Sequence, residues 1–224
     1  MRPEDEVVIH ITKDQNVFVE TKKKGIESYK CVEPNSVLDS LIYSIHHKLE
    51  LKSGLLPVNC IAFNGDESGN RFVALTFDEG SADISLEKTE YKNFPLPRLV
   101  FGFLLNKDGR IVKVMLGVTE LGRLTPKSKM YIYPLSNVSG FGLCIGSNSM
   151  PTIKSNHQLN GMPYFILSMP NNYDLYKESN TKLDLNLREL FEHLKDKNTD
   201  YYYTDVLIEM NKTLSDFING GKLI

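Results

Sequence analysis

The sequence predicts an α+β fold in which a long amphipathic helix precedes an antiparallel meander and two helices close the chain. Apolar residues recur at helical spacing between residues 36 and 49, and they do so again after residue 186. Between these segments lie short β-rich runs separated by turn residues. A block of strands between blocks of helices is typical of the α+β class.

The chain opens with two β-rich segments, residues 6–12 and 16–20, joined by a short polar connection. Two short strands connected in this way predict a hairpin. We therefore expect an N-terminal β-hairpin extension over residues 1–34 and a second domain, which includes the C-terminal helices, over residues 35–224.

A helix of about four turns is expected from Ser36 onward. Pro34 lies just before its start and Gly54 lies beyond its end, and both residue types favour these positions. The apolar residues at helical spacing are Val37, Leu38, Leu41, Ile42, Ile45 and Leu49. They share one face of the helix, which we expect to lie in the core.

Strand-like runs follow at residues 58–63, 71–77, 98–105, 110–118 and 130–133. Each is rich in β-branched, aromatic or aliphatic residues and is bounded by turn residues. The third and fourth runs are joined through an Asp-Gly pair, which supplies the positive φ angles of a tight reversal. Consecutive strands joined in this way predict an antiparallel meander.

After Pro134 the sequence predicts irregular structure as far as Thr181, with a short strand at residues 163–168 as the exception. Two helices are expected after it, the second with Thr204 as N-cap and Gly220 beyond its end. Their apolar positions are Leu187, Leu190, Phe191 and Leu194 in the first helix and Val206, Leu207, Met210, Leu214, Phe217 and Ile218 in the second.

The composition argues against several classes of protein. The 224 residues are 41% apolar, which is enough to bury one substantial core. Lys and Arg number 26 against 28 Asp and Glu, and no basic block stands out, so nucleic-acid binding has no electrostatic support. The first residues lack the apolar core of a signal peptide, and no apolar run approaches the roughly 20 residues that cross a bilayer. We expect a cytoplasmic protein without a membrane partner.

The three cysteines, Cys31, Cys60 and Cys144, are odd in number and widely spaced, which fits neither a disulfide framework nor a zinc knuckle. We interpret them as free thiols. The five histidines are scattered, and the adjacent His46 and His47 would point to different faces of a helix. We therefore expect no metal site.

The most informative stretch lies at residues 131–147, where a strand runs into a polar turn with Asn137 and reaches Cys144 seven residues later. Glycines bracket the cysteine, among them Gly140 and Gly146. Small neighbours leave room for a partner to reach a thiol. The stretch therefore indicates an exposed nucleophile.

This stretch resembles the active-site segment of ubiquitin-conjugating enzymes, in which a meander strand leads into a His-Pro-Asn-Val turn, then a glycine and then the nucleophilic cysteine. Asn137-Val138, Gly140 and Leu143-Cys144-Ile145 match that order. Leu135 and Ser136 stand where the family has His and Pro, and the asparagine lies slightly closer to the cysteine than is usual.

The chain is more similar still to a bacterial branch of that superfamily, the PRTRC system protein B group, which has a Pro-x-x-Asn-Val turn and a Cys-x-Gly-Ser segment. Pro134, Asn137-Val138 and the four residues from Cys144 fit this pattern, and residues 53–57 and 94–101 are also similar. The resemblance implies a ubiquitin-conjugating-enzyme-like fold with an antiparallel meander sheet flanked by helices.

The resemblance implies that Cys144 accepts a ubiquitin-like modifier as a thioester and passes it to an acceptor amine, while Asn137 stabilises the oxyanion. It also implies three partners: a ubiquitin-like β-grasp protein, a ThiF-like activating enzyme and a JAB-type isopeptidase of the same pathway. The activating enzyme would consume the ATP, so no cofactor is expected on this chain. Antiphage defence and plasmid maintenance are both compatible with such a pathway.

The same residues also have simpler interpretations. Cys144 would be a small buried apolar residue, and Asn137 would cap its own turn. Four neighbours are expected either to contact the tail of the modifier or to shape the loop: Ser136, Ser139, Gly146 and Ser147.

Two other functions stay open. A non-catalytic protein of the same fold would bind the modifier or the activating enzyme as a scaffold, without forming a thioester. A cysteine hydrolase or redox protein on an unrelated fold would need a His or a second Cys near Cys144, and His157 is the candidate nearest in sequence.

Overall fold

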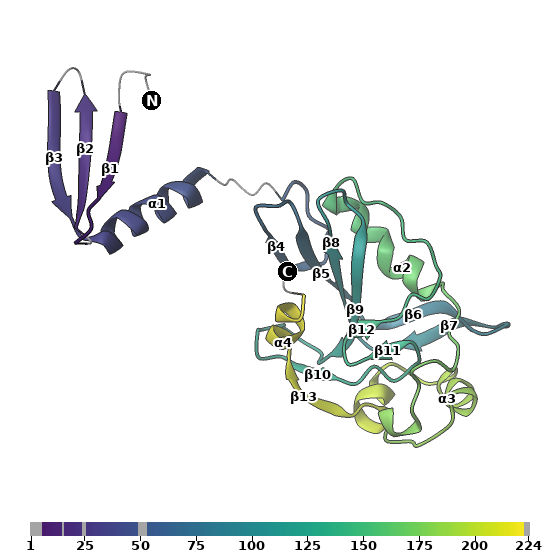
Figure 1. Ribbon diagram of the computed structural model, residues 1–224. Helices are drawn as coiled ribbons and strands as arrows, with labels where there is room; N and C mark the ends of the chain where they lie inside the picture. The colour runs from purple at the N-terminus through teal and green to yellow at the C-terminus, as the bar shows by residue number, and fades with distance from the viewer. Residues whose placement is uncertain (1–5, 15, 24–25, 49–52, 222–224) are drawn as a thin grey trace. The chain divides into compact units, whose positions relative to one another are not determined.

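The computed structural model describes residues 6–14, 16–23, 26–48 and 53–221. The chain divides into two compact units, with the boundary between residues 50 and 51 (Figure 1). This boundary differs from the expected one at residues 34 and 35, because the helix after residue 34 belongs to the first unit. The two units are described separately below.

The first unit is an antiparallel three-stranded sheet followed by a helix. Its strands are β1 (Glu6–Ile11), β2 (Val17–Lys23) and β3 (Ile26–Val32), in the spatial order β1-β2-β3, and its helix is α1 (Pro34–Lys48). The expected hairpin is therefore present, and a third strand, which the sequence reading missed, extends it.

The apolar face of α1 is turned to the sheet but is not enclosed. Val37 and Leu41 line an open groove of about 300 Å³ together with sheet residues that include Ile9 and Val19. Leu38, Leu41 and Ile42 remain 55%, 46% and 43% exposed, so the prediction that this face lies in the core is wrong for them. Their burial would need a second layer over the groove, which the described residues of this unit do not supply.

The second unit contains the predicted meander. Strands β4 (Cys60–Gly65), β5 (Arg71–Phe77), β8 (Leu99–Leu105) and β9 (Ile111–Thr119) pair antiparallel in that order. Strand β10 (Lys129–Tyr131) pairs with the C-terminal end of β9, at Val118 and Thr119. The tight reversal before β9 is closed by a 2.9 Å bond from the Gly109 amide to the Asn106 carbonyl, with the glycine at a φ of +78°.

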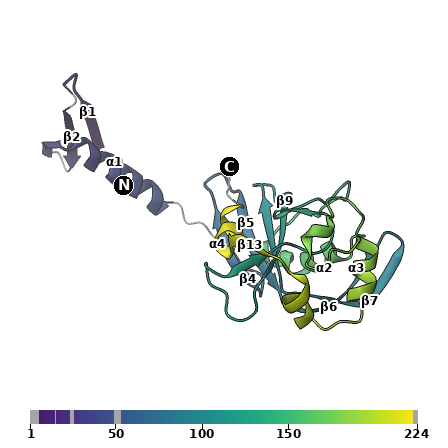
Figure 2. The ribbon, with the colours of Figure 1, turned by 90° about the horizontal axis from the view of Figure 1, so that it is seen from below.

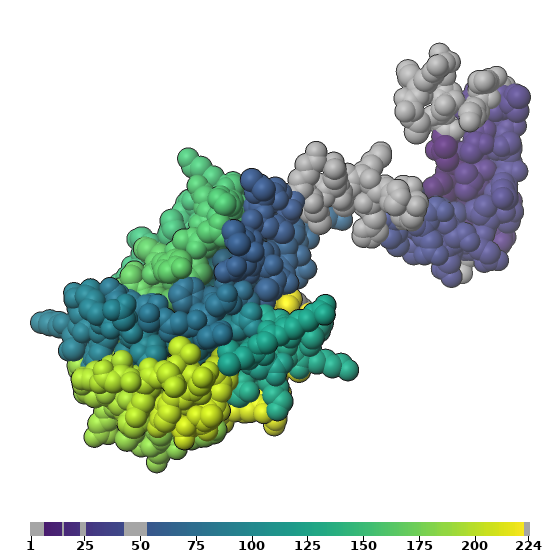
Figure 3. Space-filling model, turned by 180° about the vertical axis from the view of Figure 1, so that it is seen from behind, coloured from purple at the N-terminus to yellow at the C-terminus, as the bar shows by residue number. Residues whose placement is uncertain are grey.

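The sequence reading missed the two-stranded ribbon of β6 (Gly80–Leu86) and β7 (Thr89–Leu96), which is inserted between β5 and β8. Charged residues interrupt both strands, and neither has a continuous apolar run. The ribbon buries Phe94 against Phe191, whose ring centroids lie 5.1 Å apart. In the space-filling view the yellow-green C-terminal residues lie directly against this blue segment (Figure 3).

Two segments differ in type from the prediction. The expected strand at residues 163–168 is the helix α2 (Met162–Leu167), which follows the short 3-10 helix Asn156–Gly161. Pro163 occupies the first turn of α2, where the missing amide proton costs nothing. The first predicted C-terminal helix is confirmed as α3 (Leu187–Leu194), with Asn186 as N-cap.

The second predicted C-terminal helix is wrong over most of its length. The chain forms a π-helix (Tyr202–Val206), then strand β13 (Glu209–Thr213), then the short helix α4 (Leu214–Asn219). Strand β10 offers its free edge to β13, which gains ladder hydrogen bonds there. The N-cap is consequently Thr213 rather than Thr204, and Gly220 follows the helix as expected.

The core lies on both faces of the meander, because alternate residues of each strand point to opposite sides. On one face the buried residues pack against α2 and α3, as Val73 and Leu116 do. On the other face Phe72 and Met115 pack against α4. Figure 2 shows α4 apart from α2 and α3. Among the described helices, none has the length and apolarity needed to cross a membrane.

Candidate active site

Asn137 and Cys144 face each other across a very short hairpin. Strands β11 (Val138–Ser139) and β12 (Gly142–Leu143) pair antiparallel, and Gly140 makes the turn at a φ of +58°. The next pair outward in this register is Asn137 and Cys144, and the Cys144 amide donates a 2.8 Å hydrogen bond to the Asn137 carbonyl. The seven-residue spacing therefore places the two residues directly opposite each other.

The hairpin is fixed to the main sheet at its tip. The Leu116 amide of β9 donates a 2.9 Å bond to the Phe141 carbonyl, and Gly142 pairs with Met115. The Phe141 ring packs edge-on against Phe217 of α4, with 5.0 Å between their centroids. The position of Cys144 is thus set partly by a residue near the end of the chain.

The turn that leads into the hairpin is held by buried hydrogen bonds. Ser136 is only 1% exposed, and its hydroxyl donates to the Asn171 side-chain oxygen at 3.0 Å. The Asn171 amide and side-chain amide both donate to the Ser85 carbonyl of β6, at 2.8 Å and 3.1 Å. The Asn137 amide donates to the Asp174 carbonyl at 2.9 Å. These bonds fix the turn that carries Ser136 and Asn137 into the hairpin.

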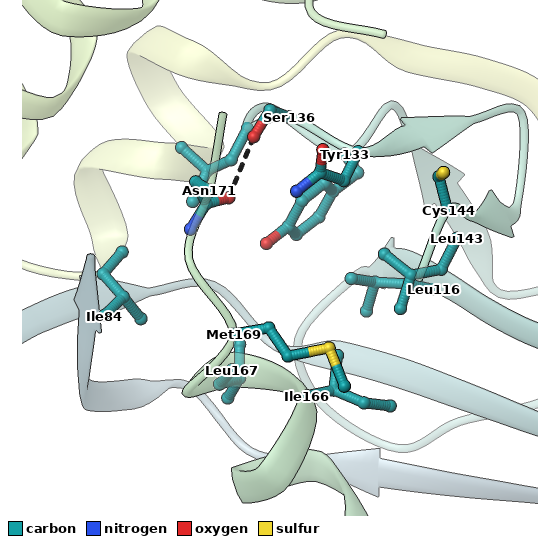
Figure 4. Close-up of a pocket in the computed structure, with 12 residues that line it drawn as sticks. Ile84, Leu116, Tyr133, Ser136, Leu143, Cys144, Ile166, Leu167, Met169 and Asn171 are labelled. Carbon is teal, nitrogen blue, oxygen red and sulfur yellow. Dashed lines mark hydrogen bonds between the residues drawn. The ribbon is translucent and has the colours of Figure 1, made fainter. Parts of the chain in front are cut away.

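Cys144 lies at the rim of a small pocket of about 30 Å³, and Asn137 lines the same pocket (Figure 4). The thiol is exposed and free. The remaining lining residues come from β6, β9, the turn before β11, β12 and the α2 segment: Ile84, Leu116, Tyr133, Leu135, Ser136, Leu143, Ile166, Leu167, Met169 and Asn171. The expectation of an exposed cysteine is met, and its interpretation as a buried apolar residue is not.

The Asn137 carboxamide makes no hydrogen bond to any residue that the structure describes. The residue adopts the left-handed conformation with a φ of +65°, which Asn tolerates better than most residues. Its backbone, rather than its side chain, therefore shapes the turn. The side-chain amide stays available to donate two hydrogen bonds in the pocket that Cys144 also lines.

The other four predicted site residues divide into two groups. Ser139 of β11, Gly146 and Ser147 are exposed, and Gly146 has a φ of +57° in the turn after the cysteine. Ser136 is buried under the turn with its hydroxyl bonded to Asn171, a position that fits the loop-shaping role expected for it.

Sequence reasoning missed Asn171 and Tyr133 as parts of this site. Asn171 is 35 residues from Ser136, and no local pattern connects the two residues. Tyr133 belongs to the stretch that the sequence singled out, but it was assigned to a strand. Its place in the apolar and aromatic run just before the turn was the available signal.

The other thiols and the histidine candidate lie outside this pocket. Cys31 is exposed on β3 of the first unit, and partial burial raises the pKa of the Cys60 thiol, which donates to the Ala62 carbonyl at 3.4 Å. His157 hydrogen-bonds to the Asn160 side chain at 3.2 Å and does not line the pocket. Within the described residues, no cluster of His, Cys, Asp and Glu could hold a metal ion.

The arrangement can support nucleophilic chemistry at sulfur. An exposed thiol lines the same pocket as a neutral hydrogen-bond donor, a group of the kind that can stabilise negative charge on an oxygen of the attacked group. No described His or second Cys among the lining residues would act as a base or a redox partner. Comparison with protein-family models, with curated proteins and with solved structures finds no match for this chain.

Proposed function

We propose that this chain is a conjugating enzyme for a ubiquitin-like protein, which it carries as a thioester on Cys144 and transfers to an acceptor amine. The observation that carries the proposal is that an exposed thiol, Cys144, and the unbonded carboxamide of Asn137 line one pocket, on residues whose backbones pair at the open end of the β11-β12 hairpin. The mixed α+β fold, in which an antiparallel meander leads into that hairpin, agrees with the family resemblance.

The proposed reaction has two steps, and Cys144 takes part in each. In the first step the Cys144 thiolate attacks the acyl carbon of an existing thioester, and the thiol of the activating enzyme leaves. In the second step an acceptor amine attacks the new thioester, and Cys144 is released. Both steps pass through a tetrahedral oxyanion, which the Asn137 amide would stabilise. A thioester is already activated, so a dedicated base beside the sulfur is not required.

The partners proposed for this reaction follow from the resemblance. They are a ThiF-like activating enzyme that uses ATP, a small β-grasp modifier and a JAB-type isopeptidase that would reverse the modification. Such a pathway would operate in the cytoplasm.

The test is reconstitution of the full chain with its activating enzyme, modifier and ATP. We expect a covalent adduct that thiols cleave. The Cys144→Ala variant should form none, whereas a Cys31→Ala/Cys60→Ala variant should form it normally, because neither of those residues lines the pocket. The adduct is measured on a non-reducing gel and by intact mass.

Two results would overturn the proposal. One is the absence of any adduct under these conditions, and the other is an adduct that persists in Cys144→Ala. Binding of the modifier without a thioester, unchanged by Cys144→Ser, would instead identify the scaffold function.

A further inference from the structure

A second pocket of the second unit brings together two buried polar atoms without a partner. Among the described residues, three buried side-chain atoms lack a hydrogen bond: Arg71 Nε, Asn156 Oδ1 and Arg98 Nε. Arg98 Nε lies 3.4 Å from the Asp78 carboxylate, which pairs with its charge. The other two atoms belong to residues that line one pocket of about 270 Å³. Buried polar atoms usually have partners, so this coincidence indicates a binding site.

Side chains from distant parts of the sequence are held in place around this pocket. Asn156 is only 5% exposed, and its side-chain amide donates a 2.7 Å hydrogen bond to the Ser53 carbonyl. The Arg71 guanidinium donates to the Ile153 carbonyl at 3.1 Å. These bonds position both side chains and leave the Asn156 oxygen and the Arg71 Nε unbonded. The full lining consists of residues 53–55, Arg71 at the start of β5, and residues 154–156.

The lining residues carry positive charge without a counter-charge. Arg71 and Lys154 are the charged residues among them, and neither forms an ion pair with a residue that the structure describes. Arg71 also has donors to spare, because a guanidinium has five N–H groups and this one bonds only to the Ile153 carbonyl among the described residues. A guanidinium and an ammonium together favour an anion, and the planar guanidinium matches a carboxylate. The ligand is therefore expected to be an anion.

Asn156 restricts the ligand further. Its side-chain oxygen only accepts hydrogen bonds, so the ligand must supply an N–H or O–H group. A sulfate or a fully ionised phosphoryl group has no such donor. A carboxylate with an amide N–H on the neighbouring carbon supplies the charge and the donor within one residue. Leu55, which is 79% exposed and lines the same pocket, offers apolar surface to the side chain of that residue.

We infer that this pocket binds the carboxylate and the adjacent amide N–H of an N-acylated apolar residue, which is either a free N-acyl amino acid or the C-terminal residue of a peptide. The carboxylate pairs with Arg71 and Lys154, and the N–H donates to Asn156 Oδ1. The apolar side chain contacts Leu55. This inference is independent of the proposed function, because Cys144 does not line this pocket.

The experiment is a calorimetric titration of the full chain with three forms of one peptide, acetyl-glycyl-glycyl-leucine. The free acid should bind saturably. The C-terminal amide lacks the negative charge, and it should bind about 10- to 100-fold more weakly, the effect of losing a hydrogen bond between charged groups. The free acid with a methylated leucine nitrogen lacks the donor for Asn156, and it should bind about 2- to 10-fold more weakly. These comparisons use the unaltered chain, so they do not depend on the folding of a variant.

Variants locate the binding in this pocket. Arg71→Gln should weaken binding of the free acid by about 10- to 100-fold, and Lys154→Gln should weaken it by about 2- to 5-fold, the effect of an exposed charge. The matched control is Lys107→Gln, because Lys107 is exposed and does not line the pocket. This control should bind the free acid as the unaltered chain does. The melting temperature of each variant, measured alongside, shows that it is folded.

Four results would overturn the inference. They are no saturable binding of the free acid, equal binding of the acid and the amide, unchanged binding in both Arg71→Gln and Lys154→Gln, and binding of inorganic phosphate as tight as that of the free acid. N-acetyl-leucine distinguishes the two sources of the ligand. Affinity equal to that of the tripeptide would support a free N-acyl amino acid, and weaker binding would support the C-terminal end of a peptide.

Discussion

Asn137 contributes to the site through both its backbone and its side chain. Its backbone holds a positive φ at the entry to the hairpin, and its carboxamide stays unbonded in the pocket that Cys144 also lines. Replacement by most residues would mix backbone strain with the loss of a donor. Glycine separates the two effects, because it adopts positive φ without strain.

We therefore predict that Asn137→Gly lowers the rate of transfer from Cys144 by about 100- to 1,000-fold, the usual cost of losing one oxyanion donor. The unfolding temperature should change little. Single-turnover transfer to an amine measures the effect. The matched control is Asn93→Gly, since Asn93 also has a positive φ, of +50°, and is exposed outside the pocket. Equal loss in both variants would contradict an oxyanion role.

At the scale of elements, the site depends on β6, a strand outside the main sheet. Asn171 joins this strand to the turn through its bonds to Ser85 and Ser136. The partner of Asn171 on the turn is buried, so removal of the Asn171 side chain would leave the Ser136 hydroxyl without an acceptor.

We predict that Asn171→Ala lowers the free energy of unfolding by about 1–3 kcal/mol, the cost of an unsatisfied buried hydroxyl. It should also slow acylation of Cys144, because the turn that presents Asn137 loses its attachment to β6. Urea denaturation measures the first effect. Asn219→Ala is the control: Asn219 is exposed at the end of α4 and bonds to Ser215 there, so its removal should cost no more than about 0.5 kcal/mol. A similar cost in both variants would contradict the role of Asn171 in holding the turn to β6.

Elements with continuous apolar runs were predictable from the sequence, and β5 was predicted with its observed bounds. The ribbon of β6 and β7 was not, because its burial comes from contact with α3, more than ninety residues later in the chain. The prediction of the second C-terminal helix was wrong for a related reason. Residues 206–218 have helical spacing, but the edge of β10 offers residues 209–213 a sheet partner that the local pattern does not reveal.

At the scale of the whole molecule, the buried core belongs to the second unit. Both hydrophobic clusters consist of residues beyond position 59, whereas Val17 is the one buried apolar side chain among the described residues of the first unit. A unit of that size with so little burial gains too little free energy to offset the ordering of its backbone.

We predict that residues 51–224 fold without the first unit and unfold cooperatively within about 3 °C of the main transition of the full chain. Residues 1–50 alone should show no cooperative transition. Circular dichroism during heating measures both. The absence of a cooperative transition in the 51–224 fragment would mean that residues 1–50 contribute to its core.

The sequence by itself determined the α+β class, the meander strands, the long helix α1, the helix α3 and the segment that contains the candidate nucleophile. These features depend on local periodicity, turn chemistry and short spacing, which the chain encodes within about twenty residues. The exposure of Cys144 was also predictable, because the glycines around it are local.

Only the tertiary structure decided what surrounds that nucleophile. The register of β11 and β12 places Asn137 opposite Cys144, the Ser136–Asn171 bond fixes the turn, and segments from residue 84 to residue 171 close the pocket into which Tyr133 points. The physical reason is that burial and hydrogen-bond satisfaction depend on neighbours that are distant in sequence. A local pattern can propose a reactive group, but its environment is set by packing.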